Sequence, residues 1–148
     1  MKLATVKHKK ITKYGFITEN RIYFATDKTF RSFPTLRDLI CHLEKDITLN
    51  KGLFLSDGIE LSQVDFCTPI REKVKIICVG LNYEKIYPVE GVSPPKPENI
   101  ILFGKEHSSL VAHNEGLEFP IGKPGLTFDY EGEVAVIIGK SGRNIPLL

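Results

Sequence analysis

The stretch that most constrains the fold is residues 129–139, Asp-Tyr-Glu-Gly-Glu-Val-Ala-Val-Ile-Ile-Gly. Its apolar half, residues 134–138, is rich in β-branched side chains and predicts a buried strand. If the strand begins at Asp129, its period of two sends Asp129, Glu131 and Glu133 to one face. Carboxylates two apart on a strand lie roughly 6.5–7 Å from each other at the Cα, so they repel unless a cation lies between them or one is protonated. The pattern predicts either a site for a hard divalent cation, Mg²⁺, Mn²⁺ or Ca²⁺, or a solvated acidic face at a strand end.

Three ordered parts of the chain resemble the fumarylacetoacetate hydrolase family. They are residues 75–83, residues 101–111, and the Glu-x-Glu segment at 129–140 with its continuation at 142–146. By this resemblance the chain is identified as a member of the family, with an N-terminal domain followed by the first half of a catalytic domain. The resemblance implies a metal-dependent enzyme in which Glu131 and Glu133 bind Mg²⁺, or alternatively Mn²⁺ or Ca²⁺. The implied substrate is a 2-oxo acid or a 1,3-dicarbonyl compound, which is hydrolysed at a C–C bond, isomerised or decarboxylated through a metal-stabilised enolate.

The predicted strand at residues 74–79 leads toward the implied substrate site. Asn82 and Tyr83 follow the end of this strand, where polar side chains can meet a ligand, and are assigned to substrate binding. In the family this exit leads into a lid with a His-x-x-Glu pair, whose histidine activates water. Here Ile86 stands at the histidine position, and Glu90, three residues after a tyrosine, is the local candidate for a catalytic group. Since isoleucine accepts no proton, the departure favours isomerisation or decarboxylation over hydrolysis; the alternative for Glu90 is an ordinary residue on the surface of the lid.

Lys105 follows the predicted strand at residues 100–103. The resemblance places it near the mouth of the active site, where its positive charge would suit a carboxylate substrate, and it is assigned a catalytic role; the alternative is a surface lysine. His107 and the serines after it lack a context such as G-x-S-x-G, so we predict no nucleophilic serine chemistry there.

Family resemblance also implies a third metal ligand, an aspartate on a later strand, and a long β-rich continuation. The 148 residues end before either of them, so we expect a fragment of a longer enzyme that is inactive alone. Two other possibilities remain open: a truncated, non-catalytic relative, and a binding module for an anionic metabolite that uses Lys105, Asn82 and Tyr83 without a metal. Open strand edges favour association, so a homo-oligomer is expected.

The predicted fold class is α+β and β-dominated: a small α/β domain at residues 1–70, then an incomplete catalytic domain at residues 71–148. Strands are expected at residues 3–6, 14–18 and 21–25, the last two joined by a hairpin turn at Glu19 and Asn20. Thr35 and Asp38 form a capping pattern before apolar residues at helical spacing, which predicts a helix of about ten residues.

Composition excludes several classes of protein. The net charge of +2 is too small to indicate nucleic-acid binding, and no apolar run approaches the roughly 20 residues of a membrane span. No signal-peptide core follows Met1, so a soluble cytoplasmic protein is expected. Cys41, Cys67 and Cys78 lack metal or disulfide spacing and are predicted to be small buried hydrophobes.

Overall fold

The computed structural model describes residues 2–43, 51–82, 97–118, 122 and 130–146. The chain forms two compact units, one comprising Met1–Arg71 with Val111–Leu148 and the other Glu72–Leu110. These units differ from the sequence-based domains, and the two-domain division at residue 70 stays a prediction. The fold class is confirmed as α+β and β-dominated, since two short helices accompany seven strands in the described residues.

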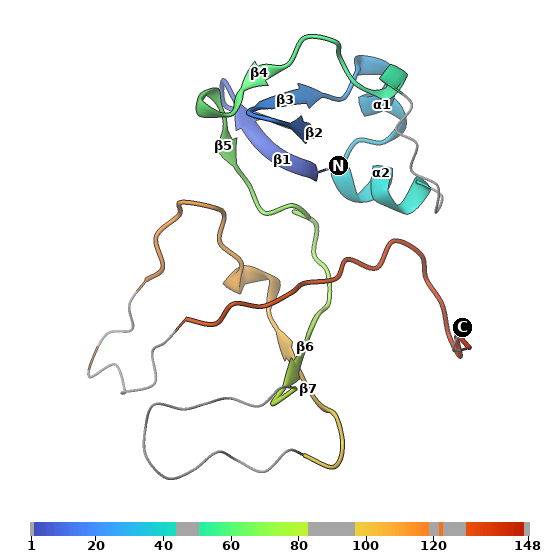
Figure 1. The fold of residues 1–148 in the computed structure, drawn as a ribbon, viewed down its shortest axis with the longest axis vertical. Coiled ribbons are helices and arrows are strands. Elements are labelled where there is room, and N and C mark those ends of the chain that lie inside the picture. Colours follow the sequence, from blue (N-terminus) through green and yellow to red (C-terminus); the bar gives the residue numbers. More distant parts are fainter. Residues whose placement is uncertain (1, 44–50, 83–96, 119–121, 123–129, 147–148) are drawn as a thin grey trace. The chain divides into compact units, whose positions relative to one another are not determined.

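The first unit is built on a five-stranded antiparallel sheet with the order β4-β3-β2-β1-β5 (Figure 1). Its strands are β1 Lys2–His8, β2 Ile11–Thr18, β3 Arg21–Phe24, β4 Ile59–Glu60 and β5 Asp65–Phe66. The two edge strands, β4 and β5, are joined only by the turn that contains the 3₁₀ helix η2, Leu61–Gln63. Five flat strands would separate these edges by roughly 19 Å, whereas the linking residues span less than about 17 Å even when extended. The sheet is therefore curled.

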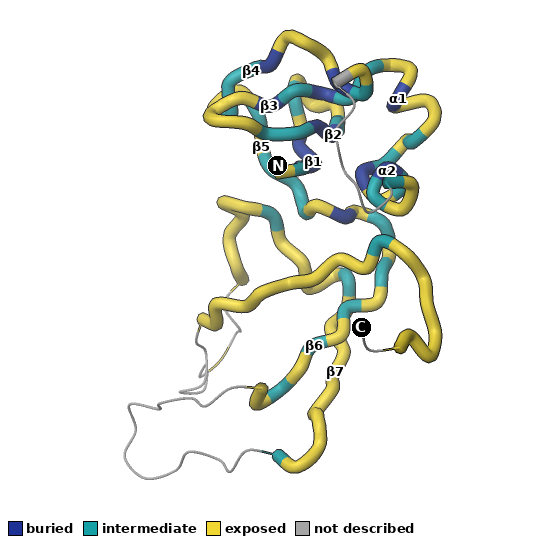
Figure 2. The backbone as a smooth tube through the Cα atoms, turned by 45° about the vertical axis from the view of Figure 1, so that its right-hand side comes forward, coloured by how far each residue is buried: buried dark blue, intermediate teal, exposed yellow. Residues whose placement is uncertain are grey.

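The curled sheet has an apolar core on each face. Strand alternation sends Ala4 and Val6 to one face, where they pack with Ile22 and Phe24. The opposite face carries Tyr14 and is covered by buried residues of the following segments: Leu36, Leu39 and Phe54. Complete burial of a side chain such as Leu39 contributes about 1.5–3 kcal/mol. Figure 2 shows that the buried residues are concentrated in this unit.

Tyr14 is the polar member of this core. It is 2% exposed, and its hydroxyl donates a 2.6 Å hydrogen bond to the carbonyl oxygen of Phe33. Burial, with a smaller contribution from the charge of Asp38, raises the pKa of Tyr14 to about 12. The phenol therefore stays neutral over the physiological pH range.

Two helices follow β3. The predicted helix is confirmed as α2, Leu36–His42, although it is shorter than the expected ten residues. Its capping box is complete, since the Asp38 N–H donates to Thr35 Oγ1 and the Thr35 N–H donates to Asp38 Oδ2, each at 3.1 Å. The other helix, α1 Asp27–Ser32, was not predicted, because its six residues bury only Thr29 and so carry no apolar stripe.

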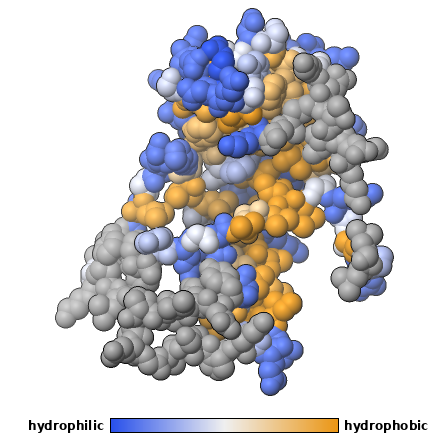
Figure 3. Space-filling model, in the orientation of Figure 1, coloured by the Kyte–Doolittle hydropathy of each residue, from blue (hydrophilic) through white to orange (hydrophobic). Residues whose placement is uncertain are grey.

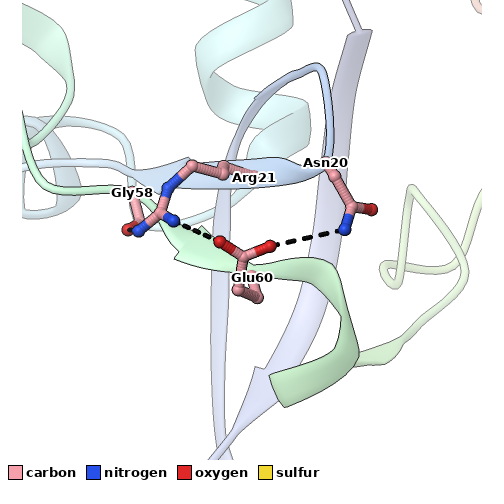
Figure 4. A network of polar contacts seen from close by, with 4 residues as sticks. All are labelled: Asn20, Arg21, Gly58 and Glu60. Carbon is pink, nitrogen blue, oxygen red and sulfur yellow. Dashed lines mark hydrogen bonds and ion pairs between the residues drawn. The ribbon is translucent and has the colours of Figure 1, made fainter.

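Tight turns join the first three strands. The predicted hairpin turn at Glu19 and Asn20 is confirmed, with Glu19 at φ 52°. A second two-residue turn joins β1 and β2, and both of its residues, Lys9 at φ 50° and Lys10 at φ 67°, are left-handed. Such a turn favours Asn-Gly, so the two lysines place strain there. On the β3–β4 side, Arg21 pairs with Glu60 and donates to the Gly58 carbonyl (Figure 4).

The second unit contains an antiparallel hairpin of β6, Ile76–Gly80, and β7, Ile101–Lys105. Both strands were predicted. Burial of β6 on both faces was also predicted, and this is wrong in the described residues: Ile77 is 65% exposed and Val79 is 42% exposed. The apolar pattern is that of a central strand, but the described residues give the hairpin only two strands. Figure 3 shows apolar surface over the hairpin.

Residues 130–146 differ most from the sequence prediction. They contain no regular strand or helix, and Val134 and Val136 are 93% and 78% exposed. The predicted buried strand is therefore wrong for the described structure. Strand propensity needs a hydrogen-bonding partner, and within the described part of the chain no strand pairs with this segment.

One further prediction concerned the three cysteines. Cys41 is exposed, which contradicts its predicted burial, while Cys67 and Cys78 are half-buried; all three are free thiols. Cys41 lies on α2, whose apolar stripe is turned to the sheet and leaves this position outside.

Among the described residues, no helix is long and apolar enough to cross a membrane.

Candidate functional site

The two predicted metal ligands lie in the irregular segment after residue 130. Glu131 and Glu133 are both exposed. Strand alternation would place both side chains on one face, but residues 130–146 form no strand. Asp129, the third carboxylate of the pattern, lies outside the described residues.

Glu131 and Glu133 offer the type of ligand that a divalent cation needs, but too few of them. Carboxylate oxygens suit Mg²⁺, Mn²⁺ and Ca²⁺, so the donor type of Glu131 and Glu133 fits. Magnesium prefers six oxygen ligands, and the part of the chain that the structure describes contains no group of three or more His, Cys, Asp or Glu residues able to hold a metal. The pair can therefore supply two ligands, and further ligands would have to come from elsewhere or from water.

The predicted substrate-binding residues follow β6. Asn82 is exposed and comes directly after Leu81, whose φ of 49° turns the chain away from the strand direction. Tyr83 and Glu90 lie outside the described residues, as do the lid positions around them.

Lys105 is the last residue of β7 and is exposed. The ladder pairs Lys105 with Ile76 and Ile101 with Gly80. Asn82 lies beyond Gly80, so Lys105 and Asn82 are at opposite ends of the hairpin. Four residue steps of strand separate Ile101 from Lys105, which is roughly 13 Å. The hairpin therefore does not bring Lys105 and Asn82 together around one small ligand.

Two polar groups that were not assigned to a site from the sequence lie in the same unit. Glu72 Oε2 and His107 Nε2 are buried atoms for which the described residues provide no hydrogen-bond partner. Buried polar atoms are nearly always paired, so each of them calls for a ligand or a water. The sequence carried a weak signal for Glu72 in its alternation with apolar residues, and none for His107.

His107 is held in place by its own turn. It begins the 3₁₀ helix η3, His107–Ser109, in which the Leu110 N–H donates to the His107 carbonyl at 3.2 Å. Ser109 Oγ donates to the Glu106 carbonyl at 2.7 Å, which closes the turn a second time. The backbone that carries the imidazole is therefore fixed locally.

Comparisons with known proteins concentrate on the second half of the chain. Residues 75–147 match the family model described as fumarylacetoacetate (FAA) hydrolase C-terminal. An uncharacterized protein of Archaeoglobus fulgidus is 37% identical over 105 residues, covering 70% of this chain and 40% of that protein. A mitochondrial oxaloacetate tautomerase of Rattus norvegicus is 40% identical over 87 residues, covering 59% of this chain and 26% of the tautomerase.

The human mitochondrial oxaloacetate tautomerase FAHD2A is 36% identical over 84 residues, which are 57% of this chain and 26% of that protein. The chain thus spans less than half the length of these curated relatives. No solved structure matches the chain significantly.

Proposed function

Because the chain belongs to the fumarylacetoacetate hydrolase family through residues 75–147, we propose that it is part of an enzyme that isomerises a small 2-oxo acid. The reaction is the interconversion of the enol and keto forms of an oxaloacetate-like substrate. The observation that carries the proposal is the similarity to oxaloacetate tautomerases, at 36–40% identity over the segment that contains the candidate site.

The lid sequence supports isomerisation over hydrolysis. Hydrolysis of a C–C bond requires an activated water, and the position at which the family carries its histidine is Ile86 here. Tautomerisation requires only that one proton leaves the enol oxygen and another reaches C3, so the atoms balance without an attacking water. Glu90 is the ionisable group that this lid sequence offers for proton transfer.

The remaining candidate residues offer two alternative places for the substrate. Lys105 offers its ammonium group to a carboxylate of the substrate, and Asn82 and Tyr83 offer hydrogen bonds after the end of β6. Because the hairpin holds Lys105 and Asn82 at opposite ends, one small substrate contacts one of the two, and Lys105→Ala and Asn82→Ala distinguish which.

Glu131 and Glu133 are the residues that would hold the metal, with Mg²⁺ proposed first and Mn²⁺ or Ca²⁺ as alternatives. A bound divalent ion supplies Lewis-acid stabilisation of negative charge on a substrate oxygen. The carboxylates of this chain would position that ion and neutralise its charge. We also propose that copies of the chain associate, because both strands of the hairpin expose apolar side chains.

The test is the ketonisation of enol-oxaloacetate by the 148-residue chain with added Mg²⁺ or Mn²⁺, monitored as the loss of the ultraviolet absorbance of the enol. Turnover in this assay would overturn the expectation from the sequence that these residues are inactive alone. We expect a rate above the uncatalysed reaction that falls at least tenfold in Glu131→Ala and in Glu133→Ala. Glu118→Ala is the matched control, since Glu118 is an exposed carboxylate in the same unit but outside the segment. Equal rates in all four proteins would refute the roles of Glu131 and Glu133, and the absence of any acceleration by the chain would refute its turnover of oxaloacetate.

A further inference from the structure

The hairpin of β1 and β2 carries a dense group of positive charges at its turn. Residues 7–13 read Lys-His-Lys-Lys-Ile-Thr-Lys and contain no aspartate or glutamate. Lys7, Lys9 and Lys10 are exposed, and Lys13 is half-buried. The net charge of the whole sequence is only +2, so positive charge is concentrated at this turn.

Arg71 adds a cation from elsewhere in the same compact unit. Its Nη1 atom donates a 2.7 Å hydrogen bond to Thr12 Oγ1, and Thr12 is the cross-strand partner of Lys7. Cross-strand partners share a face of the sheet, so the guanidinium group lies on the side of the hairpin that carries Lys7. We call the whole group the basic tip, and its members are Lys7, Lys9, Lys10, Lys13 and Arg71.

Carboxylates do not neutralise the basic tip. The described residues contain one ion pair, which joins Arg21 and Glu60 and includes no member of the tip. The sheet register places one carboxylate against the tip, that of Asp65, which lies opposite Lys7 in the ladder of β1 and β5. Five cations beside one carboxylate create a positive potential that attracts an anionic partner.

The backbone of the turn indicates that its lysines serve binding and not stability. Lys9 and Lys10 have φ values of 50° and 67°, and this left-handed conformation is costly for residues with a Cβ. A two-residue turn of this kind favours Asn-Gly. Strained residues are concentrated at functional sites, so two strained lysines among further cations indicate a binding surface.

An exposed aliphatic side chain lies among these charges. Ile11 directly follows Lys10 in the sequence and is 60% exposed. Cations next to an exposed aliphatic group suit an anionic lipid bilayer, because the headgroups attract the cations and the boundary with the acyl chains accepts the apolar group.

Aromatic surface of the kind that stacks on nucleic-acid bases is not offered here. The ring beside the tip is that of Phe24, which is only 5% exposed. Lys13 lies over this ring, with its Nζ atom 5.0 Å from the ring centroid. Proteins that bind single-stranded nucleic acids stack the bases on exposed rings, so the surface chemistry of the tip favours lipid.

We propose that the basic tip docks the protein onto an anionic lipid bilayer. Lys9 and Lys10, at the turn itself, contact the lipid headgroups, and Ile11 enters the boundary between headgroups and acyl chains. Lys7 and Arg71 add attraction from one side of the hairpin. The attachment is peripheral and reversible. It is independent of the proposed catalytic function, since none of these residues belongs to the candidate site.

Co-sedimentation of the 148-residue chain with lipid vesicles tests the proposal. Vesicles of roughly three parts phosphatidylcholine to one part phosphatidylserine present a negative surface, and phosphatidylcholine alone is the neutral control. We expect the protein to sediment with the negative vesicles and not with the neutral ones at about 0.1 M salt. Binding should be lost at about 1 M salt, where the Debye length falls from about 10 Å to about 3 Å.

The charges of the turn are tested by the double variant Lys9→Asn with Lys10→Gly. This turn sequence favours the hairpin, so a loss of binding does not come from unfolding. We expect binding roughly twentyfold weaker than that of the parent, about fivefold for each charge. The matched control, Lys2→Gln with Lys28→Gln, removes two charges at exposed positions away from the turn and should bind within about twofold of the parent.

The aliphatic contact is tested by Ile11→Thr. Threonine retains the β-branched shape that suits a strand and removes apolar surface, so vesicle binding should weaken about fivefold. Ile145→Thr is the matched control, at an isoleucine that is 74% exposed, and should leave binding unchanged.

Three outcomes would overturn the proposal. The first is no binding to negative vesicles, or equal binding to negative and neutral ones. The second is unchanged binding by the Lys9→Asn, Lys10→Gly variant. The third uses a short DNA duplex as a further probe: binding to DNA in preference to vesicles, with no effect of Ile11→Thr, would assign the basic tip to nucleic acid.

Discussion

The turn between β1 and β2 offers a direct test of the backbone strain in the first unit. Lys9 and Lys10 have φ values of 50° and 67°, so both residues of this two-residue connection are left-handed. Left-handed backbone costs a residue with a Cβ about 1–2 kcal/mol. Asparagine tolerates this conformation and glycine adopts it without a steric penalty.

Replacing the pair by Lys9→Asn and Lys10→Gly should therefore stabilise the protein. Relief of strain at two positions raises the free energy of unfolding by about 2–4 kcal/mol. The greater freedom of glycine in the unfolded chain lowers that gain by about 0.5–1 kcal/mol. Asparagine still retains part of the left-handed cost, so we expect a net gain of about 1–2 kcal/mol, equivalent to a rise of roughly 2–8 °C in the melting temperature.

The assay is urea unfolding of the double variant against the parent, with thermal unfolding as a second measurement. The control is the pair Lys73→Asn and Lys73→Gly, at an exposed lysine without positive φ, where neither substitution should stabilise. A double variant that is no more stable than the parent, or a similar gain in the Lys73 controls, would refute the assignment of strain to this turn.

Three further outcomes follow from the core of the first unit. The pKa of Tyr14 is raised to about 12 in the folded protein from a value near 10 in the unfolded chain. The neutral phenol therefore stabilises the fold by up to about 2–3 kcal/mol below pH 10, and this contribution is lost between pH 10 and 12. Urea unfolding across this range should show the loss in the parent but not in Tyr14→Phe. Leu39→Ala should lower the free energy of unfolding by about 2–5 kcal/mol, whereas Leu55→Ala, at a 45% exposed leucine, should cost less than 1 kcal/mol. Thr35→Ala removes the cap of α2 and should cost about 1 kcal/mol, while Thr35→Ser should restore most of it; a neutral Thr35→Ala variant would contradict the role of the capping box.

Local patterns predicted much of the first unit. Helix α2 is predicted by its capping residues, Thr35 and Asp38, and by the apolar spacing after them. The turn at Glu19 is predicted because the strands on either side of it alternate. The burial of Cys41 was predicted wrongly, because a short apolar neighbourhood does not show which side of a helix meets the sheet. Helix α1 was missed for a different reason, since its six residues bury only Thr29 and carry no apolar stripe.

The sequence did not reveal which strands pair with each other over long distances in the chain. Residues 134–138 have strong strand propensity, but a strand forms only where a partner offers its hydrogen bonds, and propensity does not name that partner. The apolar run of β6 indicated coverage on both faces, while the described residues give it β7 alone.

For the candidate site, too, local motifs were predictable from the sequence and the positions of the residues in space were not. Motif order identified the family, but it did not reveal that Lys105 and Asn82 lie at opposite ends of one hairpin. His107 was set aside because its neighbours in sequence form no catalytic motif. The burial of its Nε2 atom appears only in the folded structure.

Titration of Mg²⁺ and Mn²⁺ into the 148-residue chain by calorimetry shows whether Glu131 and Glu133 hold a metal ion, as proposed. We expect saturable binding, roughly millimolar or tighter, that disappears in Glu131→Ala and in Glu133→Ala and persists in Glu118→Ala. Absence of binding to the parent chain, or binding that survives both substitutions, would contradict it.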